Sequence, residues 1–130
     1  MSNMELNSTK IKNYEAFCES VLKIDKKIRF TGIYDLPRVY YKMQEGVTSY
    51  LSEFEIETSL NQSLYRWKTR LKLEQKVGLP AFSLTKYAKI YRVTMPFKDE
   101  VIFCFSTESD VNINDIIDKV IQLRDSYTKV

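Results

Sequence analysis

Apolar residues first recur every three or four positions over residues 8–27, a spacing that predicts an amphipathic helix. The predicted buried face consists of Ile11, Tyr14, Cys18, Val21 and Leu22. Asn7 or Ser8 would cap this helix, because both side chains can accept hydrogen bonds from free backbone N–H groups. Residues 1–7 are therefore expected to form a flexible tail ahead of it.

From residue 28 the apolar positions alternate with polar ones, as they do in a half-buried strand. Residues 28–35 and 39–43 are predicted to be two such strands. Asp35, Leu36, Pro37 and Arg38 lie between them and have the composition of a tight turn. These residues predict a β-hairpin.

A long amphipathic helix is predicted over residues 52–77, ended by Gly78 and Pro80. Its apolar stripe is Ile56, Leu60, Leu64, Trp67 and Leu71. Acidic residues crowd the start of this helix and basic residues crowd its end, which complements the helix dipole. We expect one continuous helix that lies over a sheet made by its neighbours.

The remainder of the chain predicts a second strand pair and a final helix. Residues 81–84 have the composition of a short strand, and residues 87–95 and 101–107 are predicted to pair around a turn at residues 96–100. The run from Val101 to Phe105 is apolar on both faces, so we place it in the middle of the sheet. An Ile-rich helix over residues 114–127 completes the chain.

The expected fold is a single α+β domain spanning residues 1–130, in the element order α-β-β-α-(β)-β-β-α. It has an antiparallel sheet flanked by helices. A chain of 130 residues with 44% apolar composition can bury one substantial core.

The N-terminus lacks the apolar block of a secretory signal, which favours a soluble, cytoplasmic protein without a membrane segment. Cys18 and Cys104 lie among apolar neighbours, which favours reduced thiols, although their spacing leaves a disulfide open.

The residue types needed for catalysis are scarce. The chain has no histidine, neither cysteine belongs to a CxxC pair, and its three glycines are far apart. Asp110, Asn112, Asn114 and Asp115 lack the glycine and terminal glutamate of a calcium loop, so helix capping is preferred. We expect no enzymatic activity, no cofactor and no metal site.

Charge is strongly segregated within a net charge of +3. Residues 61–98 carry nine basic residues and one acidic residue, whereas residues 99–130 carry three basic and seven acidic ones. Clustered cations with aromatic neighbours are typical of nucleic-acid binding. The candidate phosphate-binding residues are Arg66, Lys68, Arg70, Lys72, Lys76 and Lys89. On a helix, however, these cations border an apolar stripe and do not form one broad positive face.

Three segments carry a family resemblance: RFTGIYD, SLYRWKTRLKLEQKVG, and YAKIYRVTMPFKDEVIFCFSTESD followed by an Ile-rich helix. They resemble a small uncharacterised family of archaeal proteins. The element order also resembles the roadblock/LC7 fold, a profilin-like relative of longin domains. The roadblock resemblance implies a non-enzymatic module that dimerises through its long middle helix and an adjoining strand. It also implies that the module regulates or scaffolds a small GTPase or a sensory pathway.

We therefore expect a homodimeric interaction module that also binds a further protein partner. The predicted interface is Leu60, Leu64, Trp67 and Leu71, with Arg66 and Arg70 as charged rim residues. Packing of the same stripe on the chain's own sheet remains open, as does a small nucleic-acid-binding protein. A third alternative is a ligand pocket lined by Phe30, Tyr34, Tyr41 and Tyr91.

Overall fold

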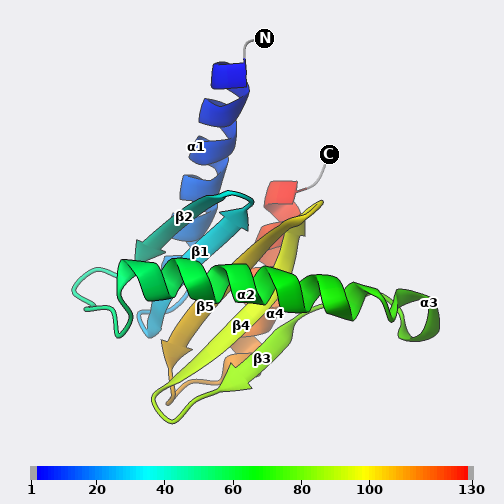
Figure 1. Ribbon diagram of the computed structural model, residues 1–130. Coiled ribbons are helices and arrows are strands. Elements are labelled where there is room, and N and C mark those ends of the chain that lie inside the picture. The colour runs from blue at the N-terminus through cyan, green and yellow to red at the C-terminus, as the bar shows by residue number, and fades with distance from the viewer. Residues whose placement is uncertain (1–2, 129–130) are drawn as a thin grey trace.

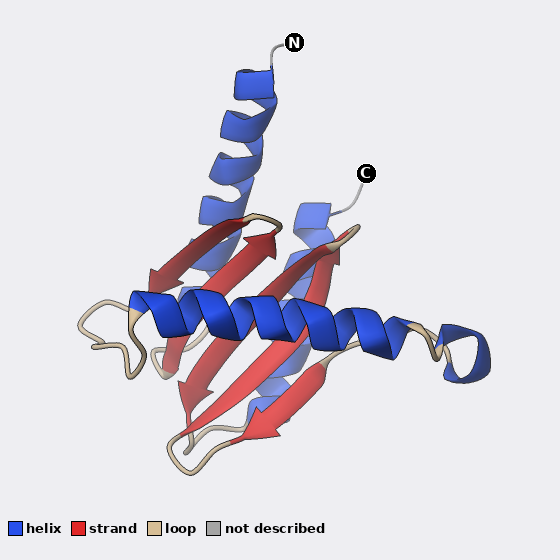
Figure 2. Ribbon diagram, viewed as in Figure 1, coloured by secondary structure: helices blue, strands red, loops and turns tan. Residues whose placement is uncertain are grey.

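The computed structural model describes the backbone of residues 3–128 and the side chains of residues 8–128. The helices are α1 (Asn3–Leu22), α2 (Glu53–Leu71), α3 (Glu74–Val77) and α4 (Ile113–Thr128). The strands are β1 (Ile28–Asp35), β2 (Arg38–Met43), β3 (Ser83–Lys86), β4 (Ile90–Lys98) and β5 (Val101–Glu108). They form one antiparallel sheet in the order β2-β1-β5-β4-β3. Helix α2 crosses one face of this sheet, and α1 and α4 cover the other (Figures 1 and 2).

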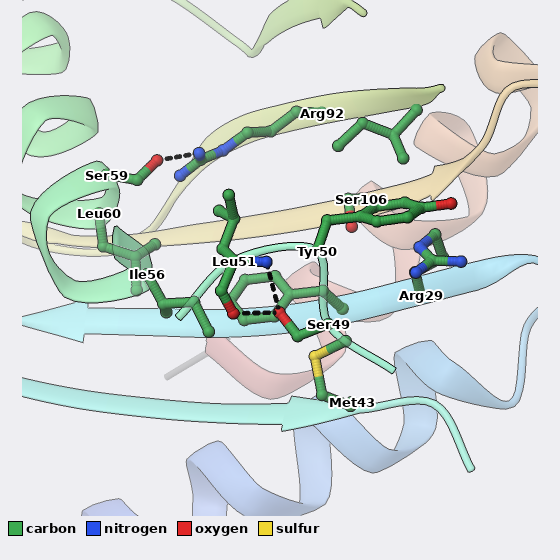
Figure 3. A pocket seen from close by; sticks show the side chains of 12 residues that line it. Arg29, Met43, Ser49, Tyr50, Leu51, Ile56, Ser59, Leu60, Arg92 and Ser106 are labelled. Carbon is green, nitrogen blue, oxygen red and sulfur yellow. Dashed lines mark hydrogen bonds between the residues drawn. The ribbon is translucent and has the colours of Figure 1, made fainter. Parts of the chain in front are cut away.

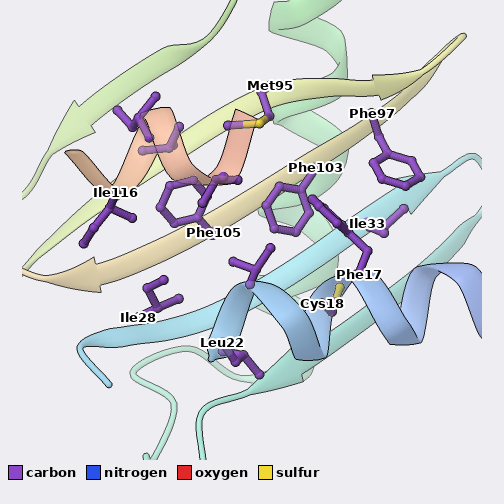
Figure 4. Packing of buried hydrophobic residues seen from close by; sticks show 14 of the residues in the cluster. Phe17, Cys18, Leu22, Ile28, Ile33, Met95, Phe97, Phe103, Phe105 and Ile116 are labelled. Carbon is purple, nitrogen blue, oxygen red and sulfur yellow. The ribbon is translucent and has the colours of Figure 1, made fainter. Parts of the chain in front are cut away.

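The central strand is β5, as its apolar run predicts. Phe103 and Phe105 point into the core beneath α1 and α4, where the Phe17 and Phe103 ring centroids are 4.7 Å apart (Figure 4). Ile102 and Cys104 point to the opposite face and pack under α2. Both faces of β5 are covered, so every position in the run contributes to one of two hydrophobic cores.

Helix α1 ends at Leu22, five residues before the predicted end. The side-chain amide of Gln44 donates to the carbonyl oxygens of Leu22, Asp25 and Ile28 at 2.9, 3.3 and 3.0 Å. The bond to Leu22 satisfies a carbonyl group that a longer helix would have satisfied internally, and the other two bonds fix the turn that leads into β1. A contact from a residue on the far side of the hairpin therefore stabilises the early end of the helix.

The start of α1 also differs from the prediction. Residues 3–7, which we assigned to a tail, have a helical backbone, and residues 1–2 lie outside the described residues. Neither Asn7 nor Ser8 acts as the N-cap, because the helix begins at Asn3. In Figure 1 the N-terminal turns of α1 extend beyond the edge of the sheet.

The predicted hairpin is confirmed. Strands β1 and β2 pair from Phe30 with Met43 to Asp35 with Arg38, and Leu36 and Pro37 form the connecting turn, with a cis peptide bond between them. The loop from β2 then leads to α2, whose N-terminus has a capping box. The Ser52 hydroxyl accepts from the Glu55 N–H at 3.2 Å, and the Glu55 carboxylate accepts from the Ser52 N–H at 3.0 Å.

The prediction of one continuous helix over residues 52–77 is wrong at its C-terminal end. Helix α2 stops at Leu71, where the N–H groups of Lys72 and Leu73 bond the carbonyls of Thr69 and Arg70 three residues back. A separate turn, α3, follows and ends at Gly78, whose φ is 89°. Trp67 is the last buried residue of α2 and residues 71–79 are all exposed, so packing no longer stabilises the helix there.

The second half of the sheet is shifted along the chain relative to the prediction. Strand β3 begins at Ser83, and β4 runs to Lys98, into the turn predicted at residues 96–100. The buried Phe97 side chain holds this end of β4 in the core, and a register irregularity between Pro96 and Lys98 accommodates the proline. Helix α4 agrees with its predicted bounds to within one residue at each end, and Asn112 caps it by accepting from the Asp115 N–H at 3.2 Å.

Candidate functional site

The inner face of α2 packs against the chain's own sheet. Leu60, Leu64 and Trp67, predicted as partner anchors, are buried in one cluster with side chains of β1 and β5, and Trp67 is only 4% exposed. Leu71, the fourth residue of the predicted interface, lies at the end of the helix and is 38% exposed. Of these four residues, only Leu71 has surface that a partner could contact in the folded chain.

The two predicted rim arginines lie on the flank of α2. Arg66 is exposed and its guanidinium lies 3.5 Å from the Ser63 hydroxyl, whereas Arg70 is partly buried. Arg92 on β4 approaches the same flank and donates to the hydroxyl groups of Ser59 and Ser63. This flank of the helix is therefore polar and positively charged.

A series of exposed apolar residues begins on α2 and follows the chain through α3 to β3. We call it the distal apolar surface, and it consists of Tyr65, Leu71, Leu73, Val77, Leu79, Phe82 and Leu84. Tyr65 and Val77 are 75% and 79% exposed. In Figure 1 the end of α2 and α3 extend past β3, which is the edge strand of the sheet. Of these residues only Leu71 belongs to the predicted interface, because the others follow no single helical or strand period.

The basic residues of the nucleic-acid alternative are mostly exposed. Arg66, Lys68, Lys72, Lys76 and Lys89 are exposed, and Arg70 is partly buried. In the described part of the chain, none of the six belongs to an ion pair. On α2 the spacing places Lys68 on one flank and Arg66 with Arg70 on the other, and Lys89 lies in the β3–β4 turn. The cations are therefore spread over several surfaces.

The four aromatic residues of the predicted ligand pocket do not come together. Phe30, Tyr34 and Tyr41 lie on the α2 side of the sheet, whereas Tyr91 packs against the core on the α1 and α4 side. The Phe30 and Tyr41 rings stack at 5.8 Å, and the Tyr34 hydroxyl donates to the Asn61 side chain at 2.9 Å. The pocket hypothesis is wrong for this set because strand alternation points Tyr91 to the other face.

A small cavity does lie under the start of α2, beside the loop that follows β2 (Figure 3). Its volume is about 60 Å³, well below the several hundred Å³ of typical small-molecule sites. Arg29 orders this region: it pairs with Glu108, donates to the Thr48 carbonyl at 2.9 Å and lies 4.2 Å from the centre of the Tyr50 ring. These contacts hold the loop against the sheet.

Among residues 8–128, no group of three His, Cys, Asp or Glu side chains is placed to hold a metal ion. Cys18 and Cys104 are free, buried thiols that pack in different cores, on opposite faces of the sheet. Burial raises the pKa of the Cys18 thiol to about 12, so the reactive thiolate is scarce at neutral pH.

The buried thiol predicts a loss of stability at alkaline pH. The unfolded thiol has a pKa of 9.0 and the folded one about 12, so the native state binds more protons across this interval. The stabilisation is complete below pH 9.0 and is lost as the pH rises toward 12. From about pH 9 to about pH 10 we expect Cys18 to account for a fall of about 1 kcal/mol in the free energy of unfolding.

Urea unfolding at both pH values, for wild type and Cys18→Ala, measures this effect. The variant should lose less stability between the two pH values than wild type does. Burial also raises the pKa values of Tyr14 and Tyr40, which both proteins retain. The charge of the Cys18 thiolate also raises the pKa of Tyr40, and the variant loses this contribution together with the thiol. Equal losses in the two proteins would show that Cys18 does not ionise differently on unfolding.

Comparisons with known proteins identify the fold. The gliding protein MglB of Thermus thermophilus superposes with a TM-score of 0.69 at 7% identity, covering 91% of this chain and 90% of that one. Myxococcus xanthus MglB gives 0.61 at 12% identity and covers 92% of both chains. An MglB in a tetrameric arrangement gives 0.62 at 9% identity, covering 88% and 92%. No protein-family model and no curated protein matches the sequence.

MglB proteins are roadblock/LC7 proteins, so the expected roadblock-like architecture is confirmed. Over the described residues, no helix has the length and apolar character needed to cross a membrane. At 7–12% sequence identity, the similarity to the MglB structures concerns the arrangement of the backbone alone. The chain is an α+β domain with a five-stranded antiparallel sheet and the MglB-like roadblock fold.

Proposed function

We propose that this protein is a non-enzymatic, homodimeric module that regulates or scaffolds a small GTPase. The observation that carries the proposal is the distal apolar surface. Large exposed apolar side chains are concentrated between Leu71 and Leu84, and groups of such side chains commonly mark protein–protein interfaces. Tyr65, Val77 and Leu79 are largely exposed within one folded chain, so a partner is needed to cover them.

A second copy of the chain is the partner that this surface fits best. Strand β3 is an edge strand, and its outer side has no strand beside it in the sheet. A two-fold axis near this edge would place β3 against β3 and bring the exposed apolar residues of both chains together. The tetrameric arrangement of one MglB supports self-association in proteins of this fold.

Regulation of a GTPase rests on the likeness to MglB. We would test it with purified small GTPases encoded in the source genome, each loaded with GDP or with the non-hydrolysable analogue GppNHp. The proposal predicts that at least one GTPase co-elutes with this protein in size-exclusion chromatography and prefers one nucleotide state. Its rate of GTP hydrolysis or nucleotide exchange should change at least several-fold in the presence of the protein.

Absence of co-elution in both nucleotide states for every GTPase tested would contradict the regulatory role. Dimerisation is measured separately, so a negative result here would leave the self-association proposal standing. Binding of this protein to nucleic acid would instead support the nucleic-acid alternative. It would show as a shift of short DNA or RNA that weakens steeply as salt is added.

A further inference from the structure

The geometry points to a second binding site, distinct from the distal apolar surface. It is a groove between the N-terminal half of α2 and the β3–β4 turn. We propose that it binds a peptide segment in which carboxylate side chains flank a large apolar residue. We call it the α2 groove, and its principal residues are Tyr50, Phe54, Tyr87, Ala88, Lys89 and Arg92.

The groove is large enough for several side chains of a peptide. Its volume is about 720 Å³, with Phe54 and Thr58 on one wall and residues 87–90 on the other. Five residues line both the groove and a 60 Å³ cavity, so the two spaces adjoin: Tyr50, Leu51, Ser59, Ile90 and Arg92. The site is therefore an open groove with a small recess next to it.

The recess fits an apolar anchor. Its walls include Met43, Ile56 and Leu60, and Figure 3 shows these side chains converging on the same space as Leu51. At about 60 Å³ the recess suits part of one aliphatic or aromatic side chain and not a whole cofactor. Tyr50, Phe54 and Tyr87 are exposed around the groove and provide the large amphipathic surfaces that are common at binding hot spots.

The charges around the groove favour carboxylates on the peptide. No ion pair in the described part of the chain involves Lys89 or Arg92. The Lys89 ammonium lies 5.2 Å from the centre of the Tyr50 ring, and the Arg92 guanidinium is held by the Ser59 hydroxyl. Glu55 is the one carboxylate that lines the groove, and the Ser52 N–H already occupies one of its oxygens.

Two cations beside an apolar recess suit a short acidic peptide better than a nucleic acid, which needs a longer row of phosphate contacts. The groove uses the N-terminal half of α2, whereas the distal apolar surface begins at Tyr65 and continues through α3. The peptide site therefore does not depend on the proposed dimer, and the two proposals can fail separately.

Selection of random twelve-residue peptides on the immobilised full-length protein would test the site. Enriched peptides should carry Asp or Glu on both sides of Leu, Ile, Met or Phe. The tightest peptide, labelled with fluorescein, should bind with an affinity that falls as salt is added. Enrichment of neutral or basic peptides, or no enrichment at all, would overturn the proposal, as would displacement of the peptide by a single-stranded oligonucleotide.

Three variants test whether the peptide binds in the α2 groove. Lys89→Glu should weaken the peptide at least tenfold, and Ala88→Trp, which fills the groove, should weaken it by a similar factor. Lys98→Glu makes the same charge change at the exposed far end of β4 and should bind as wild type does. Thermal melting checks that each variant is folded. Equal affinities for wild type, Lys89→Glu and Ala88→Trp would exclude the groove, as would equal weakening by Lys89→Glu and Lys98→Glu.

Discussion

Replacing Trp67 with alanine should lower the free energy of unfolding by about 3 to 5 kcal/mol, the usual cost of removing a large buried aromatic side chain. The indole lies in the core between α2 and the sheet, in the same cluster as Leu64, Ile102 and Cys104. This cluster holds α2 against β1 and β5. Its loss should therefore weaken the attachment of the whole helix.

Urea unfolding followed by far-UV circular dichroism measures the effect at a dilution where every protein is a monomer, and Tyr65→Ala is the matched control. Tyr65 lies on the same helix but is 75% exposed, so its removal should change the stability of the monomer by no more than about 0.5 kcal/mol. If the two variants lose the same stability, the inner and outer faces of α2 have been assigned incorrectly.

The second large effect concerns association. Tyr65→Glu places a carboxylate within the distal apolar surface, where burial against a second copy would cost several kcal/mol unless the charge were paired. We expect this variant to be a 15.4 kDa monomer at concentrations where wild type is a dimer. Its melting temperature at high dilution should equal that of wild type, because Tyr65 adds little to the core of one chain.

Light scattering gives the mass of each protein, and Gln122→Glu is the control. Gln122 is exposed on α4, on the opposite side of the sheet, and its substitution introduces the same charge change. That variant should remain a dimer. Dissociation by both substitutions would indicate a general charge effect, and dissociation by neither would place the interface elsewhere.

Periodicity alone identified most of the fold, because burial of one face of a helix or strand gives a regular spacing of apolar residues in the sequence. The stripe from Ile56 to Trp67 predicted α2 and its inner face, and the apolar run from Val101 to Phe105 predicted the central strand. Element ends were less predictable because they depend on distant contacts. The end of α1 depends on Gln44, which lies on the other side of the hairpin.

Periodicity indicates that a face is buried but not what covers it. For this reason Leu60, Leu64 and Trp67 could be read as partner anchors, whereas the chain's own sheet covers them. The exposed residues from Leu73 to Leu84 pass through a short helix, a loop and an edge strand, so no single period connects them. Only the three-dimensional structure shows that these apolar side chains are exposed.

Sedimentation equilibrium of the wild-type protein at micromolar concentration tests the central claim most directly, because it asks whether the distal apolar surface is covered in solution. We predict a species of twice the 15.4 kDa chain mass. A single 15.4 kDa species over the whole concentration range would contradict the homodimer and the function built on it.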